Sequence, residues 1–117
     1  MLSLSVKDKT LEIAGLPAAG MSFDEMQASY AEIEKMLGSS AVTGISCDLG
    51  GIAKTNYSVI TFVIGCGELA ASRKIGIAFT KLADEELRGE LTRLGFDGKG
   101  AYTPKAFRKE GPKSVFI

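Results

Sequence analysis

The residues best suited to chemistry gather between Asp48 and Ile60, in the stretch Asp-Leu-Gly-Gly-Ile-Ala-Lys-Thr-Asn-Tyr-Ser-Val-Ile. Two glycines, a lysine and a series of hydroxyl and amide side chains are residue types that surround an anion or contact a partner. A strand-like run precedes them and an apolar run follows, which is typical of a strand end that leads into the next element. We therefore expect a binding site at this junction.

A phosphate-binding loop is one chemistry that these residues suggest. Gly50 and Gly51 are followed by the pair Lys54-Thr55, and a Lys-Ser/Thr pair after glycines contacts phosphate and magnesium in P-loop proteins. The first glycine of that motif is absent here. A small-molecule or nucleotide-binding subunit that uses the Gly50–Thr55 loop therefore remains an alternative function.

The remaining chain offers little for catalysis. It contains no histidine, which removes the usual general base and the commonest transition-metal ligand. Cys47 therefore lacks a histidine to activate it, and we expect both Cys47 and Cys66 to be reduced, buried thiols. Asp84, Glu85 and Glu86 suit the first turn of a helix better than a metal site. We predict no catalytic residue, metal or cofactor, and a protein that is not an enzyme.

Length and composition indicate one globular domain. The chain has 117 residues, 45% hydrophobic and 24% charged, and its formal net charge is zero, so there is no strong nucleic-acid signal. Residues 1–96 carry 9 basic and 12 acidic side chains, net −3, whereas residues 97–117 carry 5 basic and 2 acidic, net +3. We expect a domain over residues 1–96 and a basic C-terminal extension over residues 97–117, which is either a binding arm or a solvated end.

The sequence has no sign of targeting to a membrane. Its start lacks the charged and apolar regions of a signal peptide, and no apolar run approaches the roughly 18 residues of a membrane span. We expect a cytoplasmic protein.

The elements that position the junction follow from apolar periodicity. Alternation over residues 2–6 and 11–13 predicts a β-hairpin. Ser22 and Glu25 have the spacing of a capping box, and the helix after them is expected to end at Gly38. Its apolar positions recur at helical spacing, namely Phe23, Met26, Tyr30, Ile33 and Leu37. Residues 42–49 are β-branched and apolar at alternate positions, which predicts a buried strand.

Residues 59–71 fit two structures. The run from Val59 to Ile64 has strand propensity, and Gly65 and Gly67 each cost a helix about 1 kcal/mol relative to alanine. Burial of five large apolar side chains at roughly 1.5–3 kcal/mol each would outweigh that cost in a helix. We expect a helix, with a second hairpin as the alternative.

The last elements complete an α/β order. Residues 75–79 alternate as a strand, the acidic residues 84–86 favour a helix start, and that helix is expected to end at Gly95. Val115 and Phe116 suit a late edge strand. The order β-β-α-β-α-β-α predicts a single-domain α/β fold, an open mixed sheet with helices packed on it.

The junction resembles the strand-loop-helix signature of the STAS family, named for sulfate transporters and anti-sigma factor antagonists. That signature is roughly Asp-Leu-Ser-x-Val-x-Phe-Met-Asp-Ser-Ser-Gly-Leu, and this chain aligns with it without a gap. The agreeing positions are Asp48, Leu49, Ile52, Ser58 and Ile60. The resemblance implies a STAS-like fold over residues 1–96.

Some positions depart from the signature. Asn56 replaces an aspartate, Tyr57 takes the position of the phosphorylated serine or threonine, Val59 replaces a glycine, and Lys54 stands where an aromatic residue usually packs. In such family members the partner is a kinase that is also an anti-sigma factor, and a phosphate of about −1.5 to −2 charges dissociates the complex. The resemblance implies an anti-sigma factor antagonist in bacterial signalling and transcription regulation. The alternative within the family is a STAS subunit of a bacterial lipid-transport complex, bound to its ABC transporter ATPase.

The predicted partner-binding residues are Asp48, Thr55, Asn56, Tyr57 and Ser58. Ser58 and Thr55 flank the family's acceptor position, so they are the candidate phosphorylation sites. Asn56 and Ser58 also suit the N-cap of a helix. Tyr57 is either an exposed aromatic anchor or a partly buried tyrosine. Oligomeric state and partner identity are left open.

Overall fold

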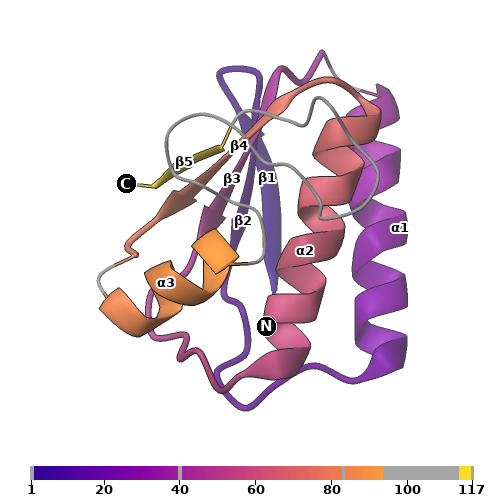
Figure 1. The fold of residues 1–117 in the computed structure, drawn as a ribbon. Coiled ribbons are helices and arrows are strands. Elements are labelled where there is room, and N and C mark those ends of the chain that lie inside the picture. The colour runs from indigo at the N-terminus through magenta and orange to yellow at the C-terminus, as the bar shows by residue number, and fades with distance from the viewer. Residues whose placement is uncertain (1, 40, 83, 94–113, 117) are drawn as a thin grey trace.

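One mixed sheet and the helices on it make up the structure, a computed structural model that describes residues 2–39, 41–82, 84–93 and 114–116 (Figure 1). The strands are β1 (Ser3–Lys7), β2 (Thr10–Ala14), β3 (Gly44–Asp48), β4 (Gly76–Thr80) and β5 (Ser114–Phe116). The helices are α1 (Phe23–Ser39), α2 (Tyr57–Ser72) and α3 (Glu85–Arg93). The predicted α/β class and element order are confirmed, and β5 is the late edge strand expected at Val115 and Phe116.

The hairpin of β1 and β2 closes through a two-residue turn. Lys7 pairs with Thr10, and between them Asp8 and Lys9 have φ angles of 51° and 64°. Positive φ at both central residues is the mark of a type I′ turn, whose twist matches that of the flanking strands. β1 lies at one edge of the sheet, and β2 is the described strand that pairs with it.

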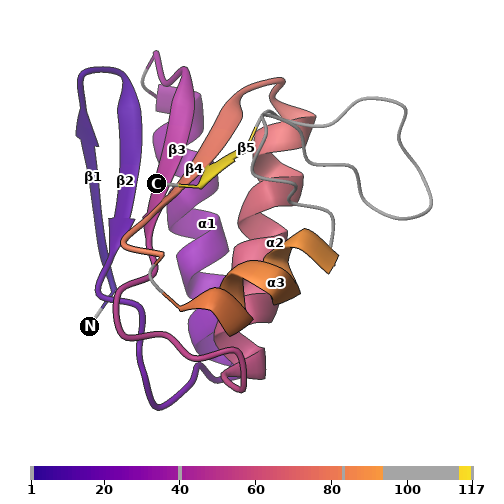
Figure 2. The ribbon, with the colours of Figure 1, turned by 60° about the vertical axis from the view of Figure 1, so that its left-hand side comes forward.

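The parallel strands follow one another across the sheet in sequence order. The order is β1-β2-β3-β4-β5, with every pair after the hairpin parallel. Right-handed crossovers between such neighbours put their helices on one face, and both ribbon views show α1 and α2 side by side there (Figures 1 and 2). The strand residues buried beneath the helices are Leu11, Ile13, Ile45, Cys47, Ile77 and Phe79. Because β2, β3 and β4 run in the same direction, the loops after them meet at one edge of the sheet.

Helix α1 begins at the predicted capping box. The Ser22 N–H donates to Glu25 Oε1, and the Glu25 N–H donates to Ser22 Oγ, both over 3.1 Å. Ile33 and Leu37 are buried, but Phe23 is 71% exposed. The prediction that Phe23 belongs to the apolar face is therefore wrong, because α1 fully buries side chains only in its second half.

Residues 59–71 are helical, as expected, within the longer helix α2 (Tyr57–Ser72), and the alternative of a second hairpin is wrong. Helix α2 buries Val59, Ile60, Phe62, Val63, Cys66, Gly67 and Ala70, so its gain from burial outweighs the cost of its glycines. Gly65 has a packing role, since a Cβ atom there would lie 2.1 Å from the Tyr30 hydroxyl. That hydroxyl donates to the Phe62 carbonyl oxygen over 3.1 Å, and the two rings stack with centroids 5.0 Å apart.

The start of α3 and the two cysteines agree with the sequence-based expectations. Asp84 Oδ1 accepts the Glu86 N–H over 2.9 Å, as expected for residues at a helix start. Cys47 and Cys66 are free and buried; a hydrogen bond to Cys47, together with burial, raises the pKa of Cys66. No helix in the described part of the chain is long and apolar enough to cross a membrane. The expected helix end at Gly95 and most of the basic extension lie outside the described residues.

Candidate functional site

Loops from three strands meet at the carboxyl edge of the sheet, the lower end of the molecule in Figure 1. They are the β2–α1 loop (residues 15–22), the junction loop between β3 and α2 (residues 49–56), and residues 81–82 after β4. The Leu49 N–H donates to the Thr80 carbonyl oxygen over 2.9 Å, so the junction loop starts with a tie to the end of β4.

Asn56 joins the junction loop to the β2–α1 loop. Its side-chain Oδ1 accepts the Val59 N–H over 3.4 Å, which makes Asn56 the predicted N-cap of α2. Its Nδ2 donates to the carbonyl oxygens of Pro17 and Ala18, each over 3.1 Å. One side chain therefore satisfies an orphan donor of the helix and two carbonyl groups of a loop 38 and 39 residues earlier.

Ser58 adds a second connection between the same loops. Its Oγ accepts the Met21 N–H over 2.8 Å and donates to Asn56 Oδ1 over 3.3 Å. A Cβ atom at Gly20, whose φ is +102°, would lie 3.0 Å from this oxygen. Ser58 is half-buried, and its hydroxyl is fixed by the hydrogen bonds to Met21 and Asn56.

Tyr57 lies between these two residues but points outward. Its side chain is 72% exposed, which decides between the two interpretations in favour of an exposed aromatic ring. A shallow polar hollow of about 380 Å³ lies beside it. The hollow is lined by Ala18, Ala19, Gly20, Gly51, Ala53, Thr55, Asn56, Tyr57 and Ser58. Thr55 is exposed at this hollow.

Asp48 takes part in a different set of contacts. Its Oδ1 accepts the Gly50 N–H over 2.9 Å, and its Oδ2 lies 3.2 Å from Lys81 Nζ. The Gly50 hydrogen bond and then the neighbouring Lys81 ammonium hold the pKa of Asp48 below its usual range, against the opposing effect of burial. Asp48 therefore shapes the start of the junction loop rather than lining the hollow beside Tyr57.

Two N–H groups of the Gly50–Thr55 loop are used within the chain, since the Gly50 N–H donates to Asp48 Oδ1 and the Ile52 N–H donates to the Leu49 carbonyl oxygen. Directly after this loop, the N–H groups of Asn56 and Tyr57 donate to the carbonyl oxygens of Ala53 and Thr55. Lys54 Nζ lies 3.2 Å from Glu86 Oε2. A phosphate cradle needs N–H groups and a lysine that point at the ligand, whereas the N–H groups of Gly50 and Ile52 and the Lys54 ammonium are paired within the chain.

The structure thus brings together four of the five predicted site residues and separates the fifth. Thr55, Asn56, Tyr57 and Ser58 share one hollow, whereas Asp48 pairs with Lys81. No sequence pattern indicates which residues of the β2–α1 loop support the junction. The turn-forming residues Pro17 and Gly20 marked that loop, but not its contacts with α2.

A second exposed aromatic ring belongs to this edge of the molecule. Phe23 is the first residue of α1, and Tyr57 is the first residue of α2. The two helices run in the same direction and start at the same end (Figure 1). Both rings are more than two-thirds exposed.

Comparison with protein-family models, with curated proteins and with solved structures finds no match for this chain. Among the described residues, no three histidine, cysteine or carboxylate side chains are grouped as metal ligands. Any assignment of function therefore rests on the geometry of this edge and on the sequence of the junction.

Proposed function

We propose that this chain is a cytoplasmic, non-enzymatic domain that binds a regulatory protein through the surface around Thr55, Asn56, Tyr57 and Ser58. The observation that carries the proposal is the exposed Tyr57 ring on a support held by cross-loop hydrogen bonds. Tyrosine offers a large contact area for little lost entropy, and it is enriched among the residues that dominate binding energy. A loop already ordered by Asn56 and Ser58 loses less entropy when a partner binds.

The junction sequence supports a more specific proposal, an anti-sigma factor antagonist whose partner is an anti-sigma factor with kinase activity. The residues that agree with the STAS signature include Ser58, and the hydrogen bonds of Ser58 indicate what its phosphorylation would do. A phosphate on its Oγ would displace the Met21 N–H and add about −1.5 to −2 charges inside the loop contacts. Thr55 is exposed, so its phosphorylation would instead add charge beside Tyr57 without breaking those bonds.

The test is affinity capture from the cells that make this protein, with identification of the captured proteins and of phosphate on residues 55–58 by mass spectrometry. An ATPase of the histidine-kinase-like class together with a sigma factor supports the proposal. A membrane ABC complex would support the lipid-transport alternative, and saturable nucleotide binding by the isolated chain would support a nucleotide-binding subunit. Failure to recover any partner, with residues 55–58 unmodified, would contradict the proposal.

Ser58→Asp is the variant that separates the switch from the scaffold. If phosphate on Ser58 releases the partner, a folded Ser58→Asp protein should lose binding. Ser58→Ala is the matched control, because it removes the same two hydrogen bonds without adding charge. Equal binding by wild-type, Ser58→Ala and Ser58→Asp proteins would rule out a switch at this residue.

A further inference from the structure

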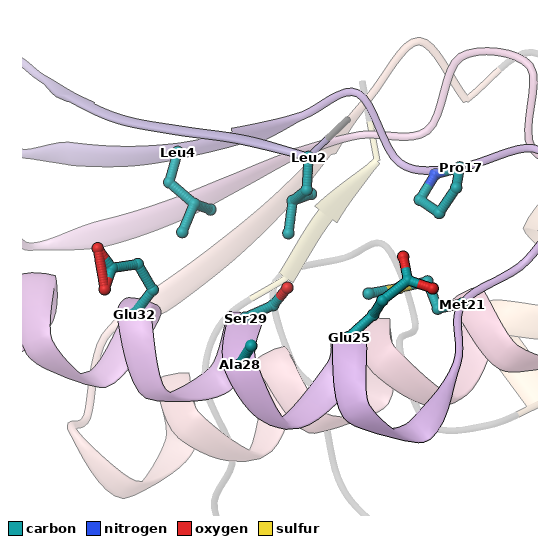
Figure 3. Close-up of a pocket in the computed structure, with 8 residues that line it drawn as sticks. All are labelled: Leu2, Leu4, Pro17, Met21, Glu25, Ala28, Ser29 and Glu32. Atoms are coloured by element: carbon teal, nitrogen blue, oxygen red, sulfur yellow. The ribbon is translucent and has the colours of Figure 1, made fainter.

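A groove separates the edge strand β1 from helix α1 (Figure 3). Its volume is about 510 Å³, and its lining is mostly apolar. The lining residues are Leu2, Leu4, Pro17, Met21, Glu25, Ala28, Ser29 and Glu32. In Figure 3 the side chains of Leu2 and Leu4 point across the groove toward α1, and those of Glu25, Ser29 and Glu32 point back toward them. The groove is therefore an apolar trough with carboxylates on its helical wall.

The groove lies beside an edge of β1 that no other described strand pairs with. Lys7 and Thr10 flank the type I′ turn, so they form a hydrogen-bonded pair, and such pairs alternate along an antiparallel ladder. Ser5 with Glu12 is the next hydrogen-bonded pair, which turns the backbone N–H and C=O groups of Leu4 and Val6 away from β2. β1 is an edge strand among the described strands, and an exposed edge of this kind is a template for another strand.

The helical wall of the groove is acidic. Glu25 and Glu32 line it, and their separation of seven residues corresponds to about 10.5 Å along a helix. In Figure 3 they lie toward opposite ends of the groove, with Leu2 between them. α1 as a whole carries four carboxylates and a single lysine, Lys35. A strand that adds to β1 would therefore meet apolar side chains in the middle of the groove and negative charge at both ends.

We propose that β1 and this groove bind an extended segment of another protein that has the pattern cation-x-aliphatic-x-cation. Alternate side chains of an added strand point to the same face, so the cations and the aliphatic residue would all face the groove. Four residues of extended chain span about 13 Å, which brings the two cations within reach of Glu25 and Glu32. The backbone would pair with Leu4 and Val6, and the aliphatic side chain would pack against Leu2 and Leu4, the β-augmentation mode of peptide recognition.

Charge argues against the β1 strand of a second copy of this chain as the occupant. Pairing of β1 with another β1 would place two acidic α1 helices along one shared groove. The only lysine within β1, Lys7, alternates with Leu4 and Val6 and so points to the opposite face of the sheet. Like charges across an interface disfavour association, so a basic partner fits this groove better.

The experiment titrates the isotope-labelled protein with the nine-residue peptide Ser-Thr-Lys-Thr-Leu-Thr-Lys-Thr-Ser and follows backbone amides by NMR. We expect the amide signals of Leu4 and Val6 to shift, with a dissociation constant below about 1 mM. A peptide of the same composition, with leucine moved by one position to the opposite face, should bind at least fivefold more weakly. Replacement of both peptide lysines by glutamate should abolish binding.

Matched charge reversals test the acidic wall. Glu32→Lys should weaken binding about threefold to tenfold, because it turns an attraction into a repulsion at an exposed site. Glu34→Lys is the control, since Glu34 is exposed on the same helix but lines a different hollow, between α1 and α2. Unfolding curves of both variants verify that they are folded.

Three results would overturn the proposal: no shift of Leu4 and Val6 at millimolar peptide, equal binding of the two leucine registers, or equal effects of the two charge reversals. A concentration-dependent dimer in sedimentation, with the same amides protected, would also overturn it, because a second copy would then fill the groove. These results are independent of partner binding at Tyr57, so either proposal can fail alone.

Discussion

Replacement of Asn56 by alanine removes the N-cap of α2 and the hydrogen bonds to the β2–α1 loop at once. Loss of the N-cap costs about 1 kcal/mol. The hydrogen bond to Pro17 is part-buried and that to Ala18 is exposed, so we take about 1 and about 0.5 kcal/mol for them. Asn56→Ala should therefore lower the free energy of unfolding by about 2.5 kcal/mol. Equilibrium urea denaturation, followed by circular dichroism, measures this directly.

Ser22→Ala is the matched control for that measurement. Ser22 Oγ accepts the Glu25 N–H at the start of α1, and this hydrogen bond is local to that helix, so its removal should cost only about 1 kcal/mol. Asn56→Asp should fall between the two, because it keeps the acceptor for Val59 and loses both donors to the β2–α1 loop. If Asn56→Ala costs no more than Ser22→Ala, the cross-loop bonds contribute nothing and the support that we attribute to Asn56 is refuted.

Three other predictions concern packing and ionisation. Gly65→Ala should destabilise the protein by about 1–3 kcal/mol, although alanine has the better helix propensity, because the added Cβ would meet the Tyr30 ring. The destabilisation should be smaller in a Tyr30→Leu background. A double-mutant cycle measured by urea denaturation gives the coupling between the two positions. Burial, and then the electrostatic effect of the neighbouring Cys66, raise the pKa of Tyr30 to about 12. Wild-type stability should therefore fall between pH 10 and 12, where the tyrosine of the unfolded chain ionises first, and the stability of Tyr30→Phe should fall less over that range. The lowered pKa of Asp48 stabilises the folded protein above the ordinary aspartate pKa of about 3.9, and this stability is lost as the pH falls below that value. Lys81→Ala should reduce the loss of unfolding free energy between pH 5 and pH 2. An unchanged dependence of the unfolding free energy on pH would contradict the pairing of Asp48 with Lys81.

Local signals in the sequence predicted much of the fold. The capping box at Ser22 and Glu25 located the start of α1, because its two hydrogen bonds are made within four residues. The N-cap at Asn56 is predictable for the same reason, because its hydrogen bond joins residues three apart. Residues 59–71 were ambiguous, since their helical state depends on burial against the sheet, which propensity alone does not contain.

The contacts that define the site are long-range, and sequence patterns do not report them. Asn56 and Ser58 had to meet carbonyl and N–H groups of the β2–α1 loop, which lie 37 to 39 residues away. The exposure of Phe23 escaped prediction because helical spacing identifies an apolar stripe but not how much of the helix reaches the sheet. The position of Asp48 in the chain predicts that it belongs to the site, whereas its side chain pairs with Lys81 instead.

The central claim, that a partner binds through the exposed ring of Tyr57, is tested most directly by affinity capture with three proteins in parallel: wild type, Tyr57→Phe and Tyr57→Ala. Loss of an aromatic anchor costs at least about 2 kcal/mol of binding energy, or roughly 30-fold in affinity. We predict that Tyr57→Phe retains the partner and that Tyr57→Ala loses it while both remain folded, because the side chain is 72% exposed. Equal recovery of the partner by Tyr57→Ala and wild type would contradict the claim.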